Sequence, residues 1–488
     1  MIPDIEIDAI WQDDLLNRKD EATALIGYIE SVSDGESANH AAFTLAIDAR
    51  YGHGKTFFLQ RLAKQLSYNH PVALVDAWTD DLADEPLIAL IATLKKALDP
   101  YIENSENLSS KWKKVLWKTG DVAKITAKGL LKRGIGLLIT GAAVEAAEQI
   151  ITGVSDDVVD AIHSNLEDVG SEAVEGGSSA LNRESSQNLM ERRVREFEDG
   201  QRAIDELKAS LRDLVASLSD EVKSAPIIII IDELDRCRPT YAIKLLEEIK
   251  HLFDVEGLVF IFGMHGQQLA HSINAAYGSS FDGPSYLRRF IQRRYTLAEP
   301  DLEPFIASLI SSSGLDISRI SYPRYRENGS KNKKSPAGFI SSYMTAYGLT
   351  ARDAFELVDI LKTAVTISSS RQLIGPYLLP LAIGQLKRLD MGQLPAVIIE
   401  PEWKLIFTTS HQAPEEISIG DAARRYQQAT QMSPVDMAAN RDNTDPIRRL
   451  VANQMNDWGE FESDAVTNYP KMLAMVRRLT NSAIASPS

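Results

Sequence analysis

A glycine-rich loop between two apolar segments constrains the fold of this chain more than any other feature. The run Ala41–Asp48 (AAFTLAID) is apolar and has the length of a strand, and a helix is predicted from Thr56 to about Leu66. The loop between them reads Ala49-Arg50-Tyr51-Gly52-His53-Gly54-Lys55-Thr56. Because a buried strand that turns tightly into a helix is the building unit of parallel sheets, this segment predicts an α/β fold.

Further strand-like and helix-like segments support the same fold class. Val72–Asp76 (VALVD) is predicted to be a strand, and a helix is predicted to follow it from Pro86 to Leu98. Pro226–Ile231 (PIIIII) is the most apolar run of the chain, and Leu258–Phe262 (LVFIF) is similar. Such runs, without alternating polar residues, are typical of strands buried on both faces of a parallel sheet.

The strand signals divide the chain into segments. We predict a first part of the α/β core, a mostly helical insertion, a second part of the core and a C-terminal helical domain at residues 1–99, 100–222, 223–299 and 300–488. Within the insertion, residues 170–186 are rich in Gly, Ser and Glu and are interpreted as a flexible connector. The charged helix predicted over Met190–Leu218 is expected to face solvent or a partner.

Charge and cysteine content narrow the classes of function. The chain has 52 Lys and Arg against 68 Asp and Glu, a formal net charge of −16, which argues against broad nonspecific binding of nucleic acid. It has one cysteine, Cys237, so no intramolecular disulfide can form, which fits a reducing cytoplasm. The N-terminal residues show no basic stretch followed by an apolar one, so we expect no signal peptide and a cytoplasmic location.

One uncharged stretch, Gly134–Val144, permits two interpretations. It is shorter than the roughly 20 apolar residues that a membrane-spanning helix needs, so we expect no transmembrane span. It can be a helix of the insertion or of the core, or it can touch a membrane surface. The basic residues before it keep the second interpretation open: Lys124, Lys128, Lys132 and Arg133.

The glycine-rich loop matches the phosphate-binding pattern G-x-x-x-x-G-K-[ST], except that Ala49 replaces the first glycine. In this pattern, glycines let backbone N–H groups face the phosphates, and the positive end of the helix dipole lies beside them. Lys55 would reach the β- and γ-phosphates, and the Thr56 hydroxyl would bind Mg²⁺. We therefore predict a site for a nucleoside triphosphate, ATP, with Mg²⁺, made by Tyr51, Gly52, His53, Gly54, Lys55, Thr56 and Phe57.

The apolar run at residues 226–231 leads into two acids, in the segment IIIIIDELDR. Asp232 would hold Mg²⁺ through water, and Glu233 would polarise the attacking water. An acid pair at the end of a strand is common by itself, because strands often end in polar loops. Together with the phosphate loop, however, it predicts a site for nucleotide hydrolysis.

Three features resemble the KAP family of P-loop NTPases. Tyr51–Thr56 is similar to the family's aromatic-Gly-x-Gly-Lys-Thr loop, which usually begins with tryptophan. Asp76-Ala77-Trp78 followed by Asp84-Glu85-Pro86-Leu87 resembles the family's AW…DPL segment, and Asp232–Cys237 (DELDRC) resembles its IDDLDRC block. The resemblance covers about residues 12–99 and 223–380.

The resemblance implies a P-loop NTPase sheet of the additional-strand type, with a long helical insertion and a C-terminal helical domain. In many family members the insertion carries transmembrane helices, but the apolar runs of this insertion are too short for a span. The resemblance also suggests a role in bacterial defence against phage, as a homo-oligomer or in a complex with other defence proteins.

The family pattern points to further residues around the phosphates. The strand after the acid block commonly ends in aspartate, whereas here it ends in His265, which could sense the γ-phosphate or be an ordinary polar strand end. Leu349–Asp353 resembles a helix start whose arginine can face the nucleotide, so Arg352 is the first candidate for that role. Asp14–Arg18 resembles the segment that flanks the base in related NTPases, or it is an ordinary helix cap. The other candidate arginines, each of which could instead form a surface salt bridge, are Arg236, Arg288, Arg289 and Arg371.

Three hypotheses of function follow. The first is an ATPase whose hydrolysis switches a conformation or drives an assembly, with Lys55 and Glu233 as catalytic residues and Arg352 supplied by the helical domain or a neighbouring subunit. The second is a nucleotide-gated binding module with little turnover, marked by the departures at Ala49 and His265. The third is a membrane-attached scaffold that acts through residues 124–144.

A basic loop in the C-terminal part could bind nucleic acid, because it combines cations with aromatic rings that bases can stack on. Solvation is the alternative for such a charged loop. Its members are Tyr322, Arg324, Tyr325, Arg326, Lys331, Lys333 and Lys334.

Overall fold

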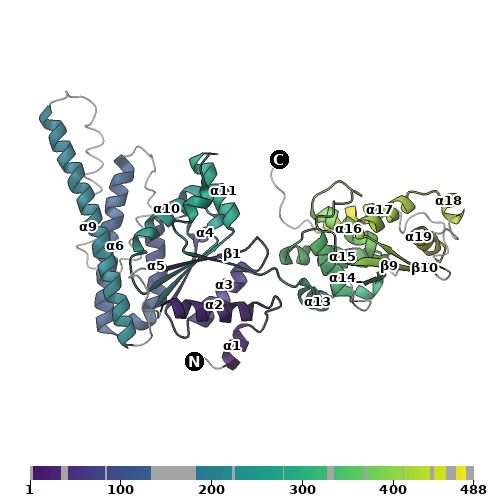
Figure 1. Ribbon diagram of the computed structural model, residues 1–488, viewed down its shortest axis with the longest axis horizontal. Helices are drawn as coiled ribbons and strands as arrows, with labels where there is room; N and C mark the ends of the chain where they lie inside the picture. The colour runs from purple at the N-terminus through teal and green to yellow at the C-terminus, as the bar shows by residue number, and fades with distance from the viewer. Residues whose placement is uncertain are drawn as a thin grey trace. The chain divides into compact units, whose positions relative to one another are not determined.

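The computed structural model describes residues 4–33, 42–82, 85–132, 183–221, 226–278, 280–326, 335–368, 372–409, 412–439, 445–457 and 469–479 (Figure 1). By its internal contacts the chain divides into two compact units. The first unit comprises Met1–Gln12, Lys19–Arg50 and Lys55–Leu297. The second unit comprises Asp13–Arg18, Tyr51–Gly54 and Ala298–Ser488.

The first unit contains a five-stranded parallel sheet with the strand order β2-β3-β4-β1-β5. Its strands are β1 (Phe43–Asp48), β2 (Val72–Asp76), β3 (Ile227–Asp232), β4 (Leu258–Met264) and β5 (Arg293–Thr296). β4 lies between β1 and β3, which is the additional-strand order that the family resemblance implied. β3 and β4 are buried along their whole length, as their uninterrupted apolar runs predict. The predicted parallel α/β sheet is thus confirmed.

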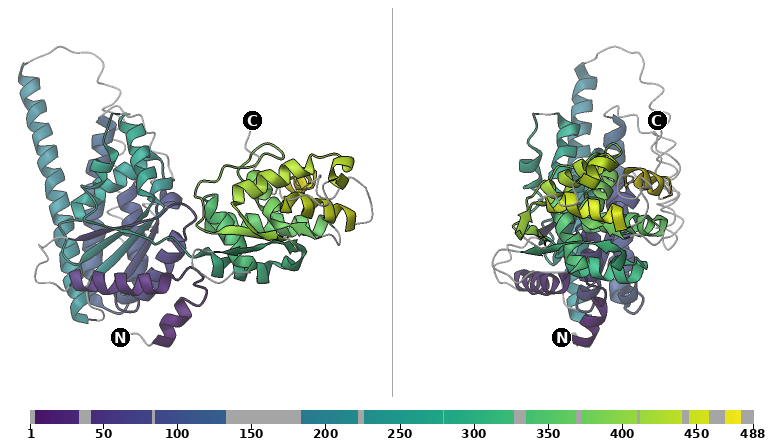
Figure 2. Two further views of the ribbon diagram at one scale, coloured as in Figure 1. Left: turned by 45° about the vertical axis from the view of Figure 1, so that its right-hand side comes forward. Right: turned by 90° about the vertical axis from the view of Figure 1, so that its right-hand side faces the viewer.

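Helices cover both faces of this sheet (Figure 2). α2 (Arg18–Ser33) and α3 (Lys55–Leu66) pack on one face with Ile228 and Ile230, and α5 (Pro86–Ile102), α10 (Pro239–Ile249) and α11 (Gly266–Tyr277) pack on the other with Ile229 and Ile231. Successive residues of a strand point to opposite faces, so the isoleucine run of β3 supplies both cores. The shorter elements are α1 (Asp4–Ile10), α4 (Ala77–Asp80), α12 (Gly283–Leu287) and the 3₁₀ turns Leu234–Arg236 and Lys250–Leu252.

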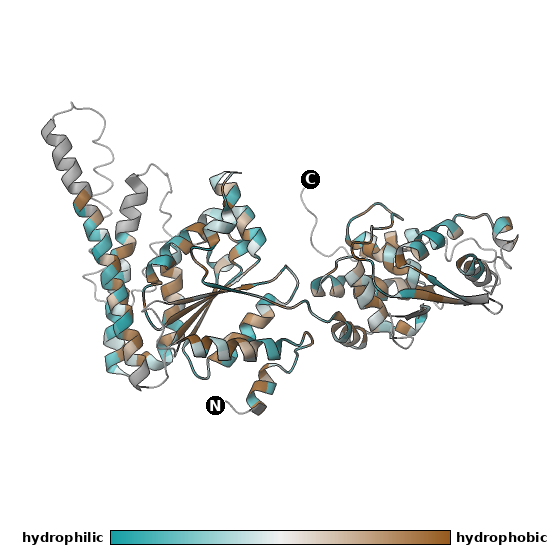
Figure 3. Cartoon of the chain, in the orientation of Figure 1, coloured by the Kyte–Doolittle hydropathy of each residue, from teal (hydrophilic) through white to brown (hydrophobic). Residues whose placement is uncertain are grey.

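Two long helices of the first unit, α6 (Glu106–Lys132) and α9 (Arg183–Glu221), pack against each other (Figure 1). Leu211 and Leu214 of α9 are buried in the same core as Trp112 of α6. The charged helix predicted over Met190–Leu218 is part of α9. The prediction that it faces solvent or a partner is therefore wrong for one of its faces. Apolar residues at helical spacing turn inward, and the charged residues between them stay outside, so teal and brown alternate along both helices (Figure 3).

Part of the predicted insertion lies outside the described residues. This applies to Gly134–Val144 and to residues 170–182 of the predicted connector, whereas residues 183–186 belong to the first turn of α9. Within the part of the chain that the structure describes, no helix combines the length and the apolar character needed to cross a membrane.

The second unit is mostly helical and also contains strands. The sequence predicts only helices and loops after residue 300, and the strands differ from that prediction because they are short and, in one case, polar (QAPEEI). β7 (Arg324–Arg326), β9 (Lys404–Thr409) and β10 (Gln412–Ile417) form an antiparallel sheet, and β6 (Ile320–Ser321) pairs with β8 (Leu373–Ile374). The helices are α13 (Leu302–Ser313), α14 (Pro336–Ala346), α15 (Ala351–Ile367), α16 (Gly375–Leu386), α17 (Ile419–Thr430), α18 (Pro434–Ala439), α19 (Pro446–Asp457) and α20 (Tyr469–Leu479), with a 3₁₀ turn at Ile317–Arg319.

Candidate functional site

The glycine-rich loop joins the end of β1 to the start of α3, as predicted. Gly52 and Gly54 have φ angles of 82° and 79°, in the left-handed region that glycine adopts without strain. A Cβ atom on Gly54 would also lie 2.9 Å from Cδ1 of Leu16, so a larger residue would require the Leu16 side chain to shift. Since α3 begins at Lys55, the N–H groups of its first turn lie beside the loop. The loop therefore has the backbone form that phosphate binding requires.

The ammonium group of Lys55 is held by a carboxylate that follows β3. Lys55 Nζ lies 3.1 Å from Oδ1 of Asp235, and the two side chains are 10% and 0% exposed. A charge-assisted hydrogen bond of this kind in a buried place is among the stronger polar contacts of a protein. The sequence analysis assigned no role to Asp235, although the second aspartate of the segment DELD is a visible signal.

Asp232, the last residue of β3, lies against Thr56 of α3. Its carboxylate accepts hydrogen bonds from the Thr56 hydroxyl and from the N–H of Glu233, the latter at 2.8 Å. Burial raises the pKa of Asp232, and these two bonds act in the opposite direction. A Cβ atom on Gly263 of β4 would lie 2.6 Å from Oδ1 of Asp232, so the neighbouring strand leaves room for this carboxylate only because it has glycine there.

The donor set at Thr56 and Asp232 fits Mg²⁺. This ion prefers oxygen ligands and usually binds one or two protein groups together with phosphate oxygens and water. Asp232 takes part in no ion pair with the described residues, because Lys55 is paired with Asp235 and the nearby Arg236 is paired with Glu233. No three His, Cys, Asp or Glu side chains among the described residues could hold a metal by themselves, so phosphate oxygens would have to complete the site.

Glu233 has an unusual backbone and an ion-pair partner. Its φ angle of 60° lies in the left-handed region, which is uncommon for a residue with a side chain and is found preferentially at functional sites. Oε1 of Glu233 lies 2.8 Å from Nη1 of Arg236, with side-chain exposures of 13% and 27%. Burial raises the pKa of Glu233, and the charge of Arg236 is the largest influence in the other direction. Arg236, a candidate for the arginine at the phosphate, is thus the partner of Glu233.

His265 and Asp48 lie at the same edge of the sheet, where β4 and β1 end. His265 caps the start of α11, and its Nδ1 atom is buried. Asp48 accepts a hydrogen bond from the N–H of Gly266 at 2.9 Å and lies 3.7 Å from Nη1 of Arg294. Asp48 was missed in the sequence, although an acid just before a phosphate loop is a recognisable position.

The comparison with protein families agrees with these motifs. Residues 18–372 match the model of the KAP family P-loop domain. This chain belongs to the KAP family of P-loop NTPases. The predicted family is confirmed, and with it the assignment as a nucleotide-binding NTPase.

Comparisons with solved structures and with curated proteins say less about this KAP protein. It is similar to a structure of the ORC2 protein of Aeropyrum pernix (ADPNP-ADP complexes), with 12% identity and a TM-score of 0.32 over 95% of this chain and 86% of that chain. It is also similar to PCH-2 of C. elegans, with 11% identity and a TM-score of 0.29 over 79% of this chain and 74% of that chain. These likenesses are too low to support statements about function. No curated protein matches the chain.

Residues of the KAP loop also make contacts inside the second unit. A Cβ atom on Gly52 would collide with Oγ1 of Thr350 and would lie 3.3 Å from Cβ of Arg352, at the start of α15. Arg18 is completely buried and donates hydrogen bonds to the carbonyl of His53 at 3.0 Å and to that of Ala298 at 2.8 Å. The segment Asp14–Arg18, which resembles the one that flanks the base in related NTPases, therefore contacts the loop through Arg18. Arg352, the first candidate for the arginine at the phosphate, lies close to Gly52.

The remaining candidates are the other arginines proposed for the phosphate and the basic loop proposed for nucleic acid. Arg288 and Arg289 are exposed at the end of α12, and Arg371 lies outside the described residues. In the basic loop, the ring of Tyr322 stacks on Phe339 with a centroid distance of 4.9 Å, so that ring already has an aromatic partner. Lys331, Lys333 and Lys334 lie outside the part of the chain that the structure describes.

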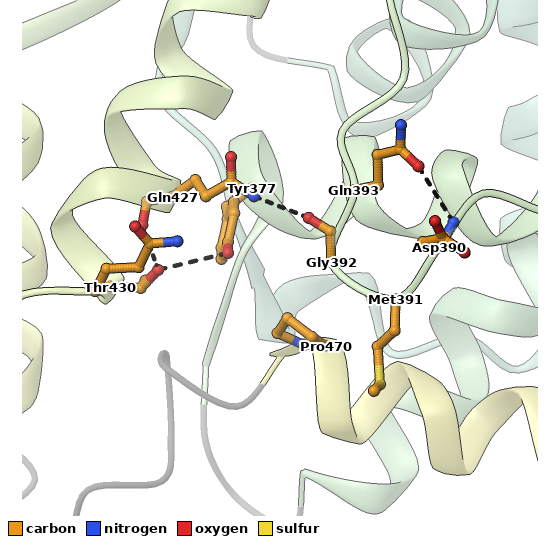
Figure 4. Close-up of a pocket in the computed structure, with 9 residues that line it drawn as sticks. Tyr377, Asp390, Met391, Gly392, Gln393, Gln427, Thr430 and Pro470 are labelled. Carbon is orange, nitrogen blue, oxygen red and sulfur yellow. Dashed lines mark hydrogen bonds between the residues drawn. The ribbon is translucent and has the colours of Figure 1, made fainter.

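A cavity of about 510 Å³ lies in the second unit, beyond the residues that match the KAP model (Figure 4). Gln427 donates to the carbonyl of Gly392 at 2.8 Å across one side, and the N–H of Asp390 donates to Gln393 at 3.3 Å on another. Among the described residues, the lining carries amides, hydroxyls and one carboxylate and no Lys, Arg or His. These residues therefore offer none of the cationic side chains that commonly bind phosphate groups.

Proposed function

We propose that this KAP protein is a Mg²⁺-dependent ATPase whose nucleotide state controls a conformation or an assembly. One observation carries the proposal. The structure brings the lysine and threonine after β1 next to the acids after β3, with Lys55 on Asp235 and Thr56 on Asp232. A phosphate-binding cation, an oxygen pair for a metal and an acid for water are the parts that phosphoryl transfer to water needs.

The loop and Lys55 bind the phosphates in this proposal. The N–H groups of the loop and of the first turn of α3 hold the phosphate oxygens, and Lys55 leaves Asp235 to pair with the β- and γ-phosphates. Tyr51, His53 and Phe57 belong to the same predicted contact surface. Thr56 and Asp232 would hold Mg²⁺, which would supply positive charge to neutralise the phosphates.

Glu233 and an arginine complete the proposed reaction. Glu233 accepts a hydrogen bond from the attacking water and orients it toward the γ-phosphorus. Arg352 is the candidate for stabilising charge on the transferred phosphoryl group, supported by its closeness to Gly52 within the second unit. His265, at the end of β4, is the candidate sensor of the γ-phosphate.

Phosphate release from ATP tests this proposal. Lys55→Ala should abolish nucleotide binding, whereas Glu233→Gln should keep ATP binding and lose turnover, because the amide cannot accept the proton of the water. Lys64→Ala in the same helix and Glu106→Gln in α6 change exposed residues of the same types and should behave like the wild type. Turnover by Glu233→Gln at the wild-type rate would refute the role of Glu233.

A nucleotide-gated binding module with little turnover is the second candidate. The substitution at Ala49, the departure at His265 and the pairing of Glu233 with Arg236 favour it. Tight ATP binding with phosphate release at background level would support this candidate and refute the ATPase. A membrane-surface scaffold is a further alternative, tested by flotation with liposomes of the full chain and of a chain without residues 124–144.

The wider role is part of the same proposal. We place the protein in the bacterial cytoplasm, in defence against phage, as a homo-oligomer or in a complex with other defence proteins. The particle mass with ADP, with ATP and with neither reports nucleotide-controlled assembly, and the same measurement with added nucleic acid tests the basic loop. Phage plating on cells that carry wild type or Lys55→Ala tests the defence role, which equal plaque numbers would contradict.

A further inference from the structure

The partner of Glu233 has a geometry that suits water activation. Nη1 of Arg236 lies 2.8 Å from Oε1 of Glu233, and the Glu233 side chain is 13% exposed. A carboxylate has about four acceptor sites on its two oxygens, so Glu233 can accept a hydrogen bond from water while it is paired with Arg236. The ion pair thus restricts the carboxylate and still leaves it acceptor capacity.

The turn that carries both residues is well fixed. The N–H of Arg236 donates to the carbonyl of Glu233 at 2.9 Å, and Leu234 and Asp235 between them are buried. The guanidinium carbon of Arg236 lies 5.6 Å from the ring centroid of Trp78, within cation–π distance. Because the backbone is anchored, the side-chain position of Glu233 depends mainly on the groups that it touches.

Trp78 is itself held at the end of β2. It lies in the short helix α4, whose N-cap is Asp76, and the Asp76 carboxylate accepts from the N–H of Thr79 at 3.1 Å and from its hydroxyl. Trp78 is 54% exposed, although an apolar ring of this size would usually be buried. Contact with Arg236 gives a physical reason for a tryptophan at this place.

We propose that Arg236 is a positioning residue for hydrolysis: it holds the carboxylate of Glu233 so that Glu233 orients the attacking water, and Trp78 holds Arg236 in place. This inference rests on the proposed role of Glu233. Arg236 acts through Glu233 and does not contact the nucleotide, which separates it from the arginine expected at the transferred phosphate.

Steady-state ATP hydrolysis by variants of the full chain tests the inference. Arg236→Gln should lower kcat by about 10- to 100-fold, the scale of a small misplacement of a catalytic group, while KM and ATP binding change little. Arg236→Lys keeps a cation within reach and should recover part of the loss. Trp78→Ala should lower kcat by at most about five-fold, the scale of an exposed cation–π contact, and Trp78→Phe should keep most of the activity.

Arg238→Gln is the matched control. It removes the same charge two positions along the chain, but Arg238 pairs with Asp81 at 2.8 Å and not with Glu233. Its kcat should stay near that of the wild type. If Arg236→Gln fails to fold, Arg236→Lys and the two Trp78 variants decide, and unchanged kcat in all three would overturn the inference.

Variants in the Glu233→Gln background separate the possible failures. If Arg236 acts through Glu233, adding Arg236→Gln to Glu233→Gln should cause no further loss of residual turnover, measured with γ-labelled ATP. A further loss of the same size as in the wild-type background would overturn the inference and assign Arg236 to the nucleotide. An inactive Glu233→Gln with a fully active Arg236→Gln would overturn this inference alone, whereas an active Glu233→Gln would overturn the proposed function as well.

Discussion

Replacement of Lys55 by alanine, the obvious test of the nucleotide site, is also expected to weaken the fold. The side chains of Lys55 and Asp235 are 10% and 0% exposed, so alanine would leave a buried carboxylate without its cation. Removing one partner of such a pair costs about 3–5 kcal/mol, and we expect the lower end because some water reaches Lys55. A loss of about 3 kcal/mol corresponds to a Tm lower by about 6–12 °C for a unit of this size.

A second substitution shows whether the uncompensated charge is the cause. Lys55→Ala/Asp235→Asn removes both charges and keeps the volume of the acid, so it should regain most of the lost stability. Lys64→Ala, at an exposed position of α3, should melt within about 1 °C of the wild type, as surface changes usually do. Thermal unfolding followed by far-ultraviolet circular dichroism measures all four proteins.

Two results would refute this account. Lys55→Ala could melt at the wild-type temperature, which would mean that the buried carboxylate is compensated in some other way. The double variant could be less stable than Lys55→Ala, which would mean that Asp235 contributes through packing or other bonds. If the expected pattern is found, the double variant is the better protein for binding assays, because its loss of ATP binding reports the missing lysine in a stable fold.

Three other predictions concern the first unit. Burial raises the pKa of Glu248 from 4.5 to about 7, so the free energy of unfolding should fall as pH rises between these values, by at most about 3 kcal/mol, and Glu248→Gln should remove this dependence in denaturant titrations at several pH values. Cys237 is buried with a pKa raised to about 12, so Ellman's reagent should find no reactive thiol in the native chain and one after denaturation; rapid native labelling would contradict its burial. Gly263→Ala should destabilise the unit by about 1–3 kcal/mol through clashes with the side chains of Leu59 and Asp232, whereas Gly120→Ala, with no neighbour within 4 Å, should not; equal unfolding curves would be evidence against these clashes.

Much of the sheet could be predicted because its signals are local. The run PIIIII and the following acid mark a strand that is buried on both faces and ends at Asp232. The loop at Gly52–Thr56 marks a second strand end, and parallel strands place both ends on the same edge. The strand β10 could not be recognised in this way, since QAPEEI has neither an apolar run nor a clear alternation.

The pairing inside the site could not be predicted, because it depends on contacts between distant segments. Lys55 and Asp235 are 180 residues apart in the sequence, and only the folded sheet brings them together. Arg236 carried the same local signal as any arginine near an acid block, so its partner could not be chosen between a phosphate, a carboxylate and solvent. In the folded chain, Arg236 pairs with Glu233 and lies beside the ring of Trp78.

The short turn Leu234–Arg236 supplies the ion-pair partners of two residues of the site. Asp235 holds the phosphate-binding lysine, and the next residue, Arg236, holds the acid proposed to orient water. Lysine and glutamate are therefore each neutralised before nucleotide binds, whereas Asp232 forms no ion pair with the described residues. A nucleotide phosphate must compete with Asp235 for Lys55, whereas Mg²⁺ meets an unpaired acid. On this basis Asp235→Asn should strengthen the binding of ATP, provided that Lys55 remains in place, and weaker binding would show that Asp235 orients the lysine more than it competes for it.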